Sequence, residues 1–331
     1  MKILLFLSTF LFGTASIFCQ TNPYNVDALT KTATKKDTLH KSEITKKMPY
    51  INPVDWQKGM RFMVEPIRHE SLRNLMKLDL APYKSEKHYL HKIKQNDFEW
   101  KEFTYQGLEV RSVKCPKGKC LRTYLIFDCE SKQYQYEYIG DTTSFRNAKV
   151  LSGVTNLVYL NEIDTAKKYL LGKTFYTKTH QLLIADKDGI GRYNKDNPKY
   201  IPVEITSIGL GTQVSPCKII FKLNGSDSLA YLNVSFSGIN AGTRPNRKSF
   251  DKFFQLDNPK NEYPKISADI WSNIQKGEVS IGMNKKECEL SWGKPNDINK
   301  TLSSHETSEQ WVYSSTSYLY FKSGILETIQ Y

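Results

Sequence analysis

Two stretches of the sequence follow one design, and this recurrence constrains the fold more than any other feature. One opens with Gly59-Met60-Arg61-Phe62 and the other with Gly172-Lys173-Thr174-Phe175, so both begin with Gly-x-x-Phe and a β-prone continuation. A polar insert follows in each, over residues 68–99 and 179–199. Each copy then resumes with alternating apolar and polar residues between glycine and asparagine turns, which is typical of half-buried strands. We therefore predict two similar small antiparallel β-sheets or barrels, with a single larger β domain as the alternative.

Helices are expected only as short connections in this part of the chain. The 20 Tyr, 16 Phe and 5 Trp residues favour a β-rich structure. Within the first insert, Leu72, Leu75 and Leu78 recur at helical spacing and predict a helix near residues 71–78. A second helix is expected in the segment 151–171, which joins the two copies.

The N-terminus has the layout of a secretory signal peptide. Lys2 precedes an apolar stretch that continues to Phe18 and contains small residues near its end. The stretch is too short and too rich in small polar residues for a membrane span, although a buried helix is an alternative. We expect residues 1–19 to be removed and the mature chain to reach the periplasm or cell surface. A lipid anchor on Cys19 is the other fate, but that processing requires a small residue where Phe18 stands.

The chain divides into five segments on these patterns. Residues 20–50 are rich in threonine and lysine and poor in large apolar residues, so they are expected to form a disordered linker. The two β-rich repeats are expected over residues 51–155 and 156–248, and a third module over residues 249–331.

Two of the six cysteines are placed to form a disulfide. Cys115 and Cys120 flank the turn-forming sequence Pro116-Lys117-Gly118-Lys119, so a tight hairpin would bring them together. An exported chain allows such a bond to form. The remaining cysteines of the mature chain are Cys129, Cys217 and Cys288, which lie in apolar patterns typical of small buried residues.

The last module carries the most specific local signals. Ser267 is placed to cap a short helix that ends at Gly277, and Asn284 with Glu287 forms a capping box for a second helix. Gly293 and Pro295 end that second helix. Three strands are expected to follow, at Glu309–Tyr313, Ser317–Phe321 and Ile325–Tyr331. The complete chain is therefore predicted to be α+β and β-rich, with two similar sheets followed by a helix-helix-three-strand module.

The C-terminal module resembles the SmpA/OmlA family, whose best-known member is an outer-membrane assembly lipoprotein. The resemblance covers roughly the last 65 residues and depends on a set of glycine, apolar and aromatic positions: Gly277, Val279, Ile281, Gly282, Met283, Trp292, Gly293, Pro295, Trp311, Tyr313, Tyr320, Phe321, Gly324 and Ile329. The same fold type occurs doubled in β-lactamase inhibitor proteins. The resemblance implies a small α+β module used for binding or scaffolding. The family's lipidated cysteine directly precedes its domain, whereas Cys19 is far from this module.

No combination of residues requires a catalytic, cofactor or metal site. His88-x-x-His91 has helical metal-site spacing but lies in a lysine-rich, polar segment. Asp186-x-Asp188-Gly189 matches a calcium loop only in part, because Ile190 takes the next acidic position. Gly209-Leu210-Gly211 lacks the third glycine and the helix of a phosphate loop. We therefore assign no catalytic, cofactor-binding or metal-binding residue.

A partner surface is the functional feature that the sequence offers. Trp311 alternates with Tyr313, and Tyr318 alternates with Tyr320, so each pair shares a sheet face and is a candidate partner surface. The alternative is that such a face forms the core beneath the two helices. The partner expected is a protein or an anionic envelope component. The net charge of +13 would suit an anionic partner, but its scattered lysines are equally explained by solubility, and nucleic acid is not expected for an exported chain. The predicted function is an exported, non-enzymatic binding or scaffold protein. Alternatives are an enzyme-inhibitor-like binder and a hydrolase with a cleft between the repeats.

Overall fold

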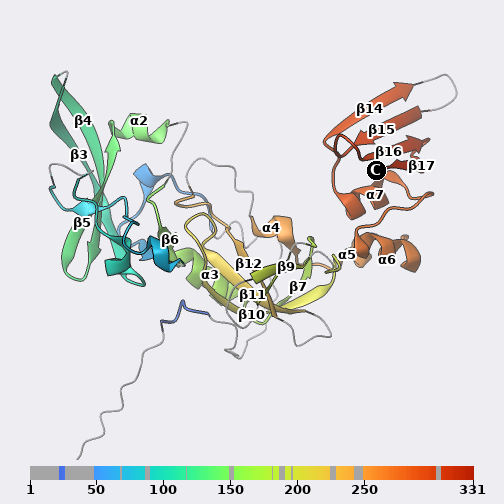
Figure 1. Ribbon diagram of the computed structural model, residues 1–331, viewed down its shortest axis with the longest axis horizontal. Helices are drawn as coiled ribbons and strands as arrows, with labels where there is room; N and C mark the ends of the chain where they lie inside the picture. Colours follow the sequence, from blue (N-terminus) through green and yellow to red (C-terminus); the bar gives the residue numbers. More distant parts are fainter. Residues whose placement is uncertain are drawn as a thin grey trace, which may run out of the picture.

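The computed structural model describes residues 22–26, 48–67, 69–85, 90–116, 118–148, 153–180, 182–185, 191–194, 197–223, 229–241, 249–302 and 307–331. Three antiparallel sheets follow one another along this part of the chain (Figure 1). The predicted fold class, α+β and β-rich with two similar sheets before a smaller module, is confirmed. The predicted signal peptide, residues 1–19, lies outside the described residues.

The first two sheets share one strand order. The first sheet is β2-β5-β4-β3-β1-β6, and the second is β9-β8-β12-β11-β10-β7-β13. In each, the first strand is followed by an insert with an edge strand, a three-strand meander and a short helix, and a last strand returns to pair with the first strand. The first sheet comprises β1 (Arg61–Val64), β2 (Ala81–Pro82), β3 (Glu102–Cys115), β4 (Gly118–Cys129), β5 (Lys132–Ile139) and β6 (Leu157–Tyr159), with α2 (Thr142–Arg146). The second comprises β7 (Thr174–Thr177), β8 (Leu182–Ala185), β9 (Gly191–Asn194), β10 (Pro202–Leu210), β11 (Cys217–Leu223), β12 (Leu229–Val234) and β13 (Phe254–Gln255), with α4 (Phe250–Phe253).

The recurrence extends to individual hydrogen bonds. The N–H of Gly59 donates to the carbonyl of Tyr105, and the N–H of Gly172 donates to the carbonyl of Ile205, both at 2.8 Å. A β-bulge follows at the same place in each sheet, between Tyr105 and Gly107 and between Ile205 and Ser207. A bulge bends its strand and increases the local twist, so both sheets curl at equivalent positions.

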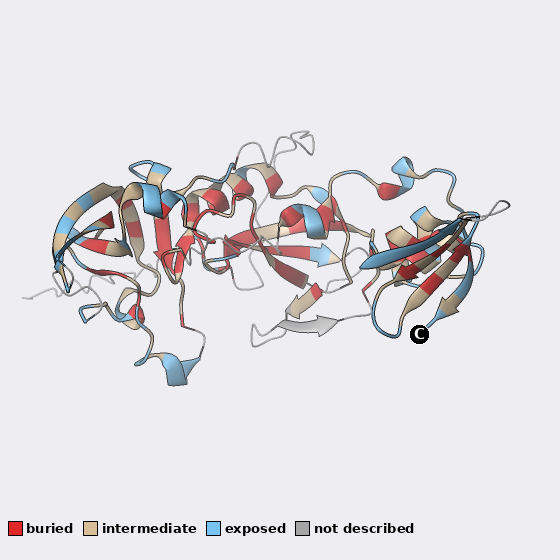
Figure 2. Ribbon diagram, turned by 90° about the horizontal axis from the view of Figure 1, so that it is seen from above, coloured by how far each residue is buried: buried red, intermediate tan, exposed pale blue. Residues whose placement is uncertain are grey.

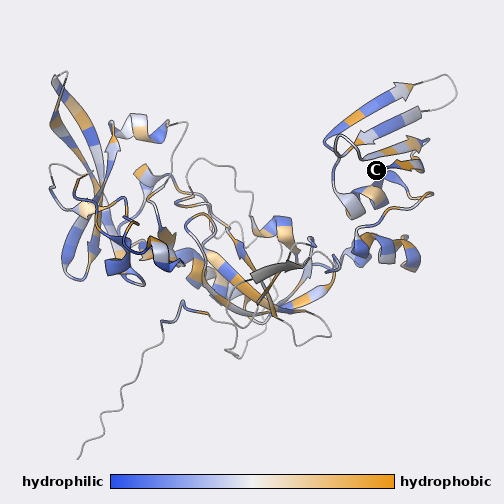
Figure 3. Ribbon diagram, in the orientation of Figure 1, coloured by the Kyte–Doolittle hydropathy of each residue, from blue (hydrophilic) through white to orange (hydrophobic). Residues whose placement is uncertain are grey.

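Each sheet encloses an apolar core on its curled face. Apolar and polar residues alternate along much of β3, whereas β4 is buried at each position from Thr123 to Phe127 (Figure 3). Buried positions are concentrated within the sheets (Figure 2). The first core is aromatic, and its buried rings include Trp56, Phe62, Phe103, Tyr105 and Phe127. The second core is mainly aliphatic, and α3 (Leu160–Leu170) contributes Leu160, Ile163, Ala166 and Leu170 to it.

One aromatic residue in each repeat packs into the module that follows it. Trp100 and Tyr200 occupy equivalent positions and both have a positive φ, 63° and 56°. Trp100 packs against the core of the second sheet, and Tyr200 packs against the core of the C-terminal module. The Tyr200 ring meets the Trp271 ring edge-on, with a centroid separation of 6.0 Å. The repeated position therefore joins successive modules.

The structure changes two of the predicted boundaries and part of the predicted linker. β6 extends the first sheet to Tyr159, and β13 extends the second to Gln255, so the predicted repeat ends at residues 155 and 248 are too early. Within the predicted linker of residues 20–50, Tyr24 and Met48 are buried in the core of the second sheet. The N–H of Leu210 donates to the carbonyl of Tyr24 at 2.8 Å. Tertiary contacts therefore hold the described residues 22–26 and Met48 despite their weak local preferences.

The helix predicted near residues 71–78 is wrong. One 3-10 turn occupies Glu70–Leu72, and the side chain of Leu75 is exposed while that of Leu78 is buried. The N–H of Leu78 donates to the carbonyl of Ile93 at 3.0 Å. This distant backbone partner holds the segment extended, and it overrides the helical spacing of the leucines.

The C-terminal module has the predicted helices and one strand more than predicted. Ser267 caps α6 (Ala268–Lys276), and Gly277 ends it in the left-handed conformation with a φ of 73°. The capping box of Asn284 and Glu287 is present at the start of α7 (Lys285–Trp292). The short α5 (Pro259–Glu262) precedes both helices. The sheet has four strands in sequence order: β14 (Asp297–Leu302), β15 (Thr307–Val312), β16 (Tyr318–Lys322) and β17 (Ile325–Gln330).

The second repeat holds this module through a buried lysine. Lys199 Nζ donates to the carbonyl of Leu290 at 3.1 Å and to that of Ser291, at the C-terminal end of α7. The Tyr200 hydroxyl donates to the same Leu290 carbonyl at 3.2 Å. Burial lowers the pKa of Lys199 to about 8. The free carbonyls of a helix end attract a cation, so this contact orients α7 on the second repeat.

Among the described residues, no helix combines the length and the apolar character that a membrane crossing needs.

Candidate functional site: the open face of the C-terminal sheet

The four aromatic residues predicted as a partner surface lie on two different faces. Trp311 points toward the helices, is 6% exposed and packs against Phe321 with ring centroids 4.7 Å apart. Tyr313 lies beyond the end of β15, where its ring meets Trp292 edge-on at 5.1 Å. The Tyr313 hydroxyl donates to the carbonyl of Gly293 at 2.9 Å, and burial raises its pKa. Trp311 and Tyr313 therefore serve the packing of the module.

Tyr318 and Tyr320 lie on the opposite, open face. Their rings are tilted to each other at a centroid separation of 6.4 Å. Both side chains are partly exposed. Because side chains alternate along a strand, Leu319 and Phe321 fill the core while the two tyrosines face away from it.

A hydrogen-bonded row of polar side chains crosses all four strands on this open face. Asn299 Nδ2 donates to Gln310 Oε1 at 2.9 Å, and Gln310 Nε2 donates to the Tyr320 hydroxyl at 3.0 Å. The Tyr320 hydroxyl donates to Gln330 Oε1 at 2.7 Å. Each contact fixes the rotamer of the next side chain, so the row presents a pre-arranged polar surface. A shallow groove of about 490 Å³ runs along it, lined in part by Thr301 and Lys322.

Strand β14 borders this face and is exposed along its whole length. Its outer edge presents backbone N–H and C=O groups. A strand from a partner protein can pair with such groups and extend the sheet. Neither β14 nor the polar row was predicted. Residues 297–302 lack the alternation of a half-buried strand, and the row depends on a register that joins four strands.

An ionic cluster on the covered face holds the sheet to α7. Glu309 Oε1 lies 2.9 Å from Lys285 Nζ and 3.2 Å from Lys300 Nζ, and Trp311 Nε1 donates to Glu309 Oε2 at 3.0 Å. Burial acts to raise the pKa of Glu309, but the bonds from Trp311, Lys285 and Lys300 outweigh it and lower this pKa to about 2. The ionised carboxylate of Glu309, on β15, therefore forms ion pairs that connect this strand to α7 and to β14.

Replacing Glu309 by glutamine should reduce the stability of the C-terminal module by about 2 kcal/mol, because two lysines lose their partner. The folded pKa lies below the value of about 4.3 for an unfolded glutamate. The stabilisation is therefore complete above about pH 5 and is lost as the pH falls toward 2. Urea denaturation followed by near-ultraviolet circular dichroism at several pH values measures this effect.

The exposed Glu327 provides the control for this measurement. E327Q should follow the wild-type pH profile, because Glu327 lies on the same sheet but outside the cluster. A wild-type profile for E309Q would contradict the role given to Glu309.

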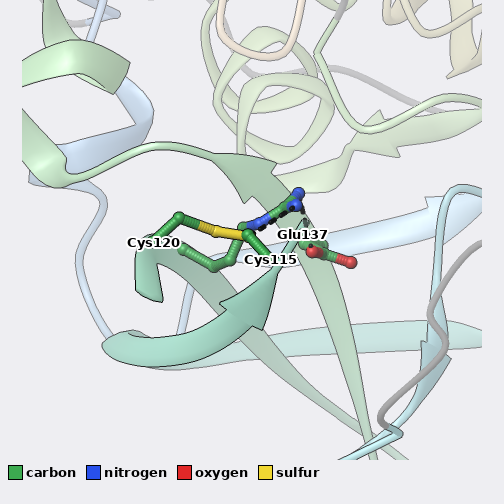
Figure 4. The surroundings of a disulfide bond; sticks show 4 residues. Cys115, Cys120 and Glu137 are labelled. Carbon is green, nitrogen blue, oxygen red and sulfur yellow. Dashed lines mark hydrogen bonds and ion pairs between the residues drawn. A yellow bond between two sulfur atoms is a disulfide. The ribbon is translucent and has the colours of Figure 1, made fainter. Parts of the chain in front are cut away.

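The predicted disulfide pair lies at the end of the β3–β4 hairpin. Cys115 and Cys120 are joined by a disulfide, with their Cα atoms 6.0 Å apart (Figure 4). Arg122 Nη1 lies 3.1 Å from Glu137 Oε1, and Arg122 Nη2 lies 3.8 Å from Cys115 Sγ. This ion pair links the base of the hairpin to β5.

The remaining candidates from the sequence were metal-binding and nucleophilic side chains. Within the described residues, no group of three or more His, Cys, Asp or Glu side chains is arranged to hold a metal ion. His88 and the loop at residues 186–190 lie outside the described residues. Ser85 Oγ lies 2.5 Å from His91 Nδ1, but both side chains are in one insert and the contact is exposed. Cys288 is fully buried, and burial raises its pKa to about 12, as expected of a packed thiol.

Comparison with known proteins gives no match: no family model, no curated protein and no solved structure matches this chain.

Proposed function

We propose that this chain is an exported, non-enzymatic binding protein of the bacterial cell envelope, and that it holds a protein partner on the open face of its C-terminal sheet. The observation that carries this proposal is the polar row from Asn299 to Gln330 with the partly exposed Tyr318 and Tyr320 rings. Tyrosine supplies a large contact area at a low entropic cost, and pre-arranged amides supply directional hydrogen bonds. The exposed edge of β14 adds a place for main-chain pairing.

Two further features support export to an envelope compartment. Residues 1–19 have the composition of a signal peptide, and Cys115 and Cys120 form a disulfide, a bond that persists in oxidising compartments. The resemblance of the last module to the SmpA/OmlA family favours the same setting.

The proposal is tested with the tagged mature protein in an envelope extract from the source organism. Proteins retained by the wild type are quantified by mass spectrometry and compared with those retained by Y318S/Y320S and by Q310A. We expect one protein to be enriched by the wild type and to fall at least about tenfold with Y318S/Y320S, since tyrosine is enriched among the few interface residues whose truncation costs about 2 kcal/mol or more.

Exposed residues distant from this face provide the matched control. K260S, on α5, should retain the partner at the wild-type level. Failure to enrich any protein, or equal loss with K260S, would contradict the proposed function.

A further inference from the structure

The tip of the β3–β4 hairpin is a two-stranded ribbon that projects beyond its sheet (Figure 1). β5 pairs with β4 only from Arg122 onward, so residues 112–115 and 118–121 pair only with each other. A two-stranded ribbon is marginally stable alone in water. The Cys115–Cys120 disulfide closes this ribbon, and the Arg122–Glu137 ion pair fastens its base.

The ribbon places two lysines directly opposite each other. Lys114 and Lys119 are register partners in the β3–β4 pair, and both are exposed. Neither makes an ion pair with any residue that the structure describes. Like charges in directly opposed positions destabilise an antiparallel pair. The tip therefore carries a concentrated positive charge that the described part of the chain does not neutralise.

Apolar side chains are exposed on the same face of the β3–β4 hairpin, at Leu121 within the ribbon and at Val110 just below its base. Val110 is 45% exposed and Leu121 is 46% exposed. Val110 lies two positions from Ser112, which pairs with Leu121, and the lysine pair lies two positions further along. Because side chains alternate, these residues share one face. Cys120, in register with Val113, lies on the other face, so the disulfide leaves the first face free.

We propose that this face of the hairpin tip docks on an anionic phospholipid surface. The two lysines would meet lipid phosphates, and Val110 and Leu121 would enter the headgroup region. Interfacial elements bind membranes by this combination of basic and apolar side chains on one face. The chain's net charge of +13 favours approach to such a surface. This surface is separate from the open face of the C-terminal sheet, and its test does not depend on the proposed partner.

The test is co-sedimentation of the oxidised mature chain with vesicles. One set contains phosphatidylcholine alone, and the other contains phosphatidylcholine with phosphatidylglycerol. We expect binding to the anionic vesicles only. K114S/K119S should weaken it by about 30-fold, because each lysine near an anionic surface contributes roughly fivefold in affinity. V110S/L121S should weaken binding as well, whereas inorganic phosphate at millimolar concentration should not displace the chain.

A control variant with the same change in net charge distinguishes binding through the two tip lysines from binding through the overall positive charge of the chain. K132S/K260S removes two exposed lysines, at the far end of β5 and on α5. This variant should keep nearly all of the affinity. Equal losses for the two lysine pairs, an unchanged V110S/L121S variant, displacement by inorganic phosphate, or no binding to anionic vesicles would each overturn the proposal. K114S/K119S should melt at or above the wild-type temperature, because the substitution removes a repulsion.

Discussion

Replacing Glu162 by alanine should lower the free energy of unfolding of the second repeat by about 3–5 kcal/mol, because each buried donor that loses its acceptor costs about 1–3 kcal/mol. Glu162, in the first turn of α3, is 1% exposed. Its carboxylate accepts hydrogen bonds from the N–H of Phe236 at 2.8 Å and of Ser237 at 3.3 Å, and also from the Ser237 hydroxyl. Alanine would leave these donors unpaired in a dry cavity.

The isosteric and exposed variants show which property of Glu162 matters. E162Q keeps the side-chain volume but replaces one acceptor oxygen by an NH₂ donor. We therefore expect its free energy of unfolding to lie between that of the wild type and that of E162A. E204A, an exposed position on β10, should change stability by less than about 0.5 kcal/mol. Hydrogen exchange in the segment after β12 reports the effect directly, and wild-type protection of residues 235–238 in E162A would contradict it.

Replacing Asn240 by alanine should loosen the junction between the two repeats at a cost of about 3–5 kcal/mol. Asn240 is 3% exposed, and its Oδ1 accepts from the N–H of Val154 at 2.5 Å. Its Nδ2 donates to the carbonyls of Val154 and Leu157 at 2.9 and 2.6 Å. One side chain thus satisfies three backbone groups at the start of β6, and the variant should be cleaved sooner near residue 153 in limited proteolysis.

A glycine variant distinguishes the stability lost with the amide hydrogen bonds from the stability lost through backbone strain. Asn240 has a φ of 62°, which glycine adopts without strain and alanine does not. N240G should therefore lose nearly as much stability as N240A if the amide bonds carry the effect. N261A, on the exposed surface of α5, should behave as the wild type. Recovery of wild-type stability in N240G would assign the effect to strain.

The repeat was predictable because its signals recur in the chain. Gly59 and Gly172 begin equivalent strands, and each donates to the carbonyl at an equivalent bulge. The equivalence of Trp100 and Tyr200 was not predictable, because they differ in type and their inserts differ in length. Their common role becomes apparent only from the strands that follow them and the cores that they enter.

The candidate surface was predictable only in part. Alternation placed Tyr318 with Tyr320 and Trp311 with Tyr313, but it cannot say which pair faces the helices. Packing decides this, because the core needs Trp311 beside Phe321. The partners of Tyr320 come from strands β15 and β17, and one of its neighbours along the row, Asn299, belongs to a strand that the sequence does not indicate.

The sequence by itself determined the features set within a few residues: the alternating strands, the caps at Ser267 and Asn284, and the closeness of Cys115 to Cys120. Only the tertiary structure decided the edge strands β6 and β13 and the faces of the C-terminal sheet. The physical reason is the separation in sequence between the groups that interact. A cap or a hairpin is satisfied by its neighbours in sequence, whereas an edge strand and a buried carboxylate are stabilised by groups that only the folded chain brings near.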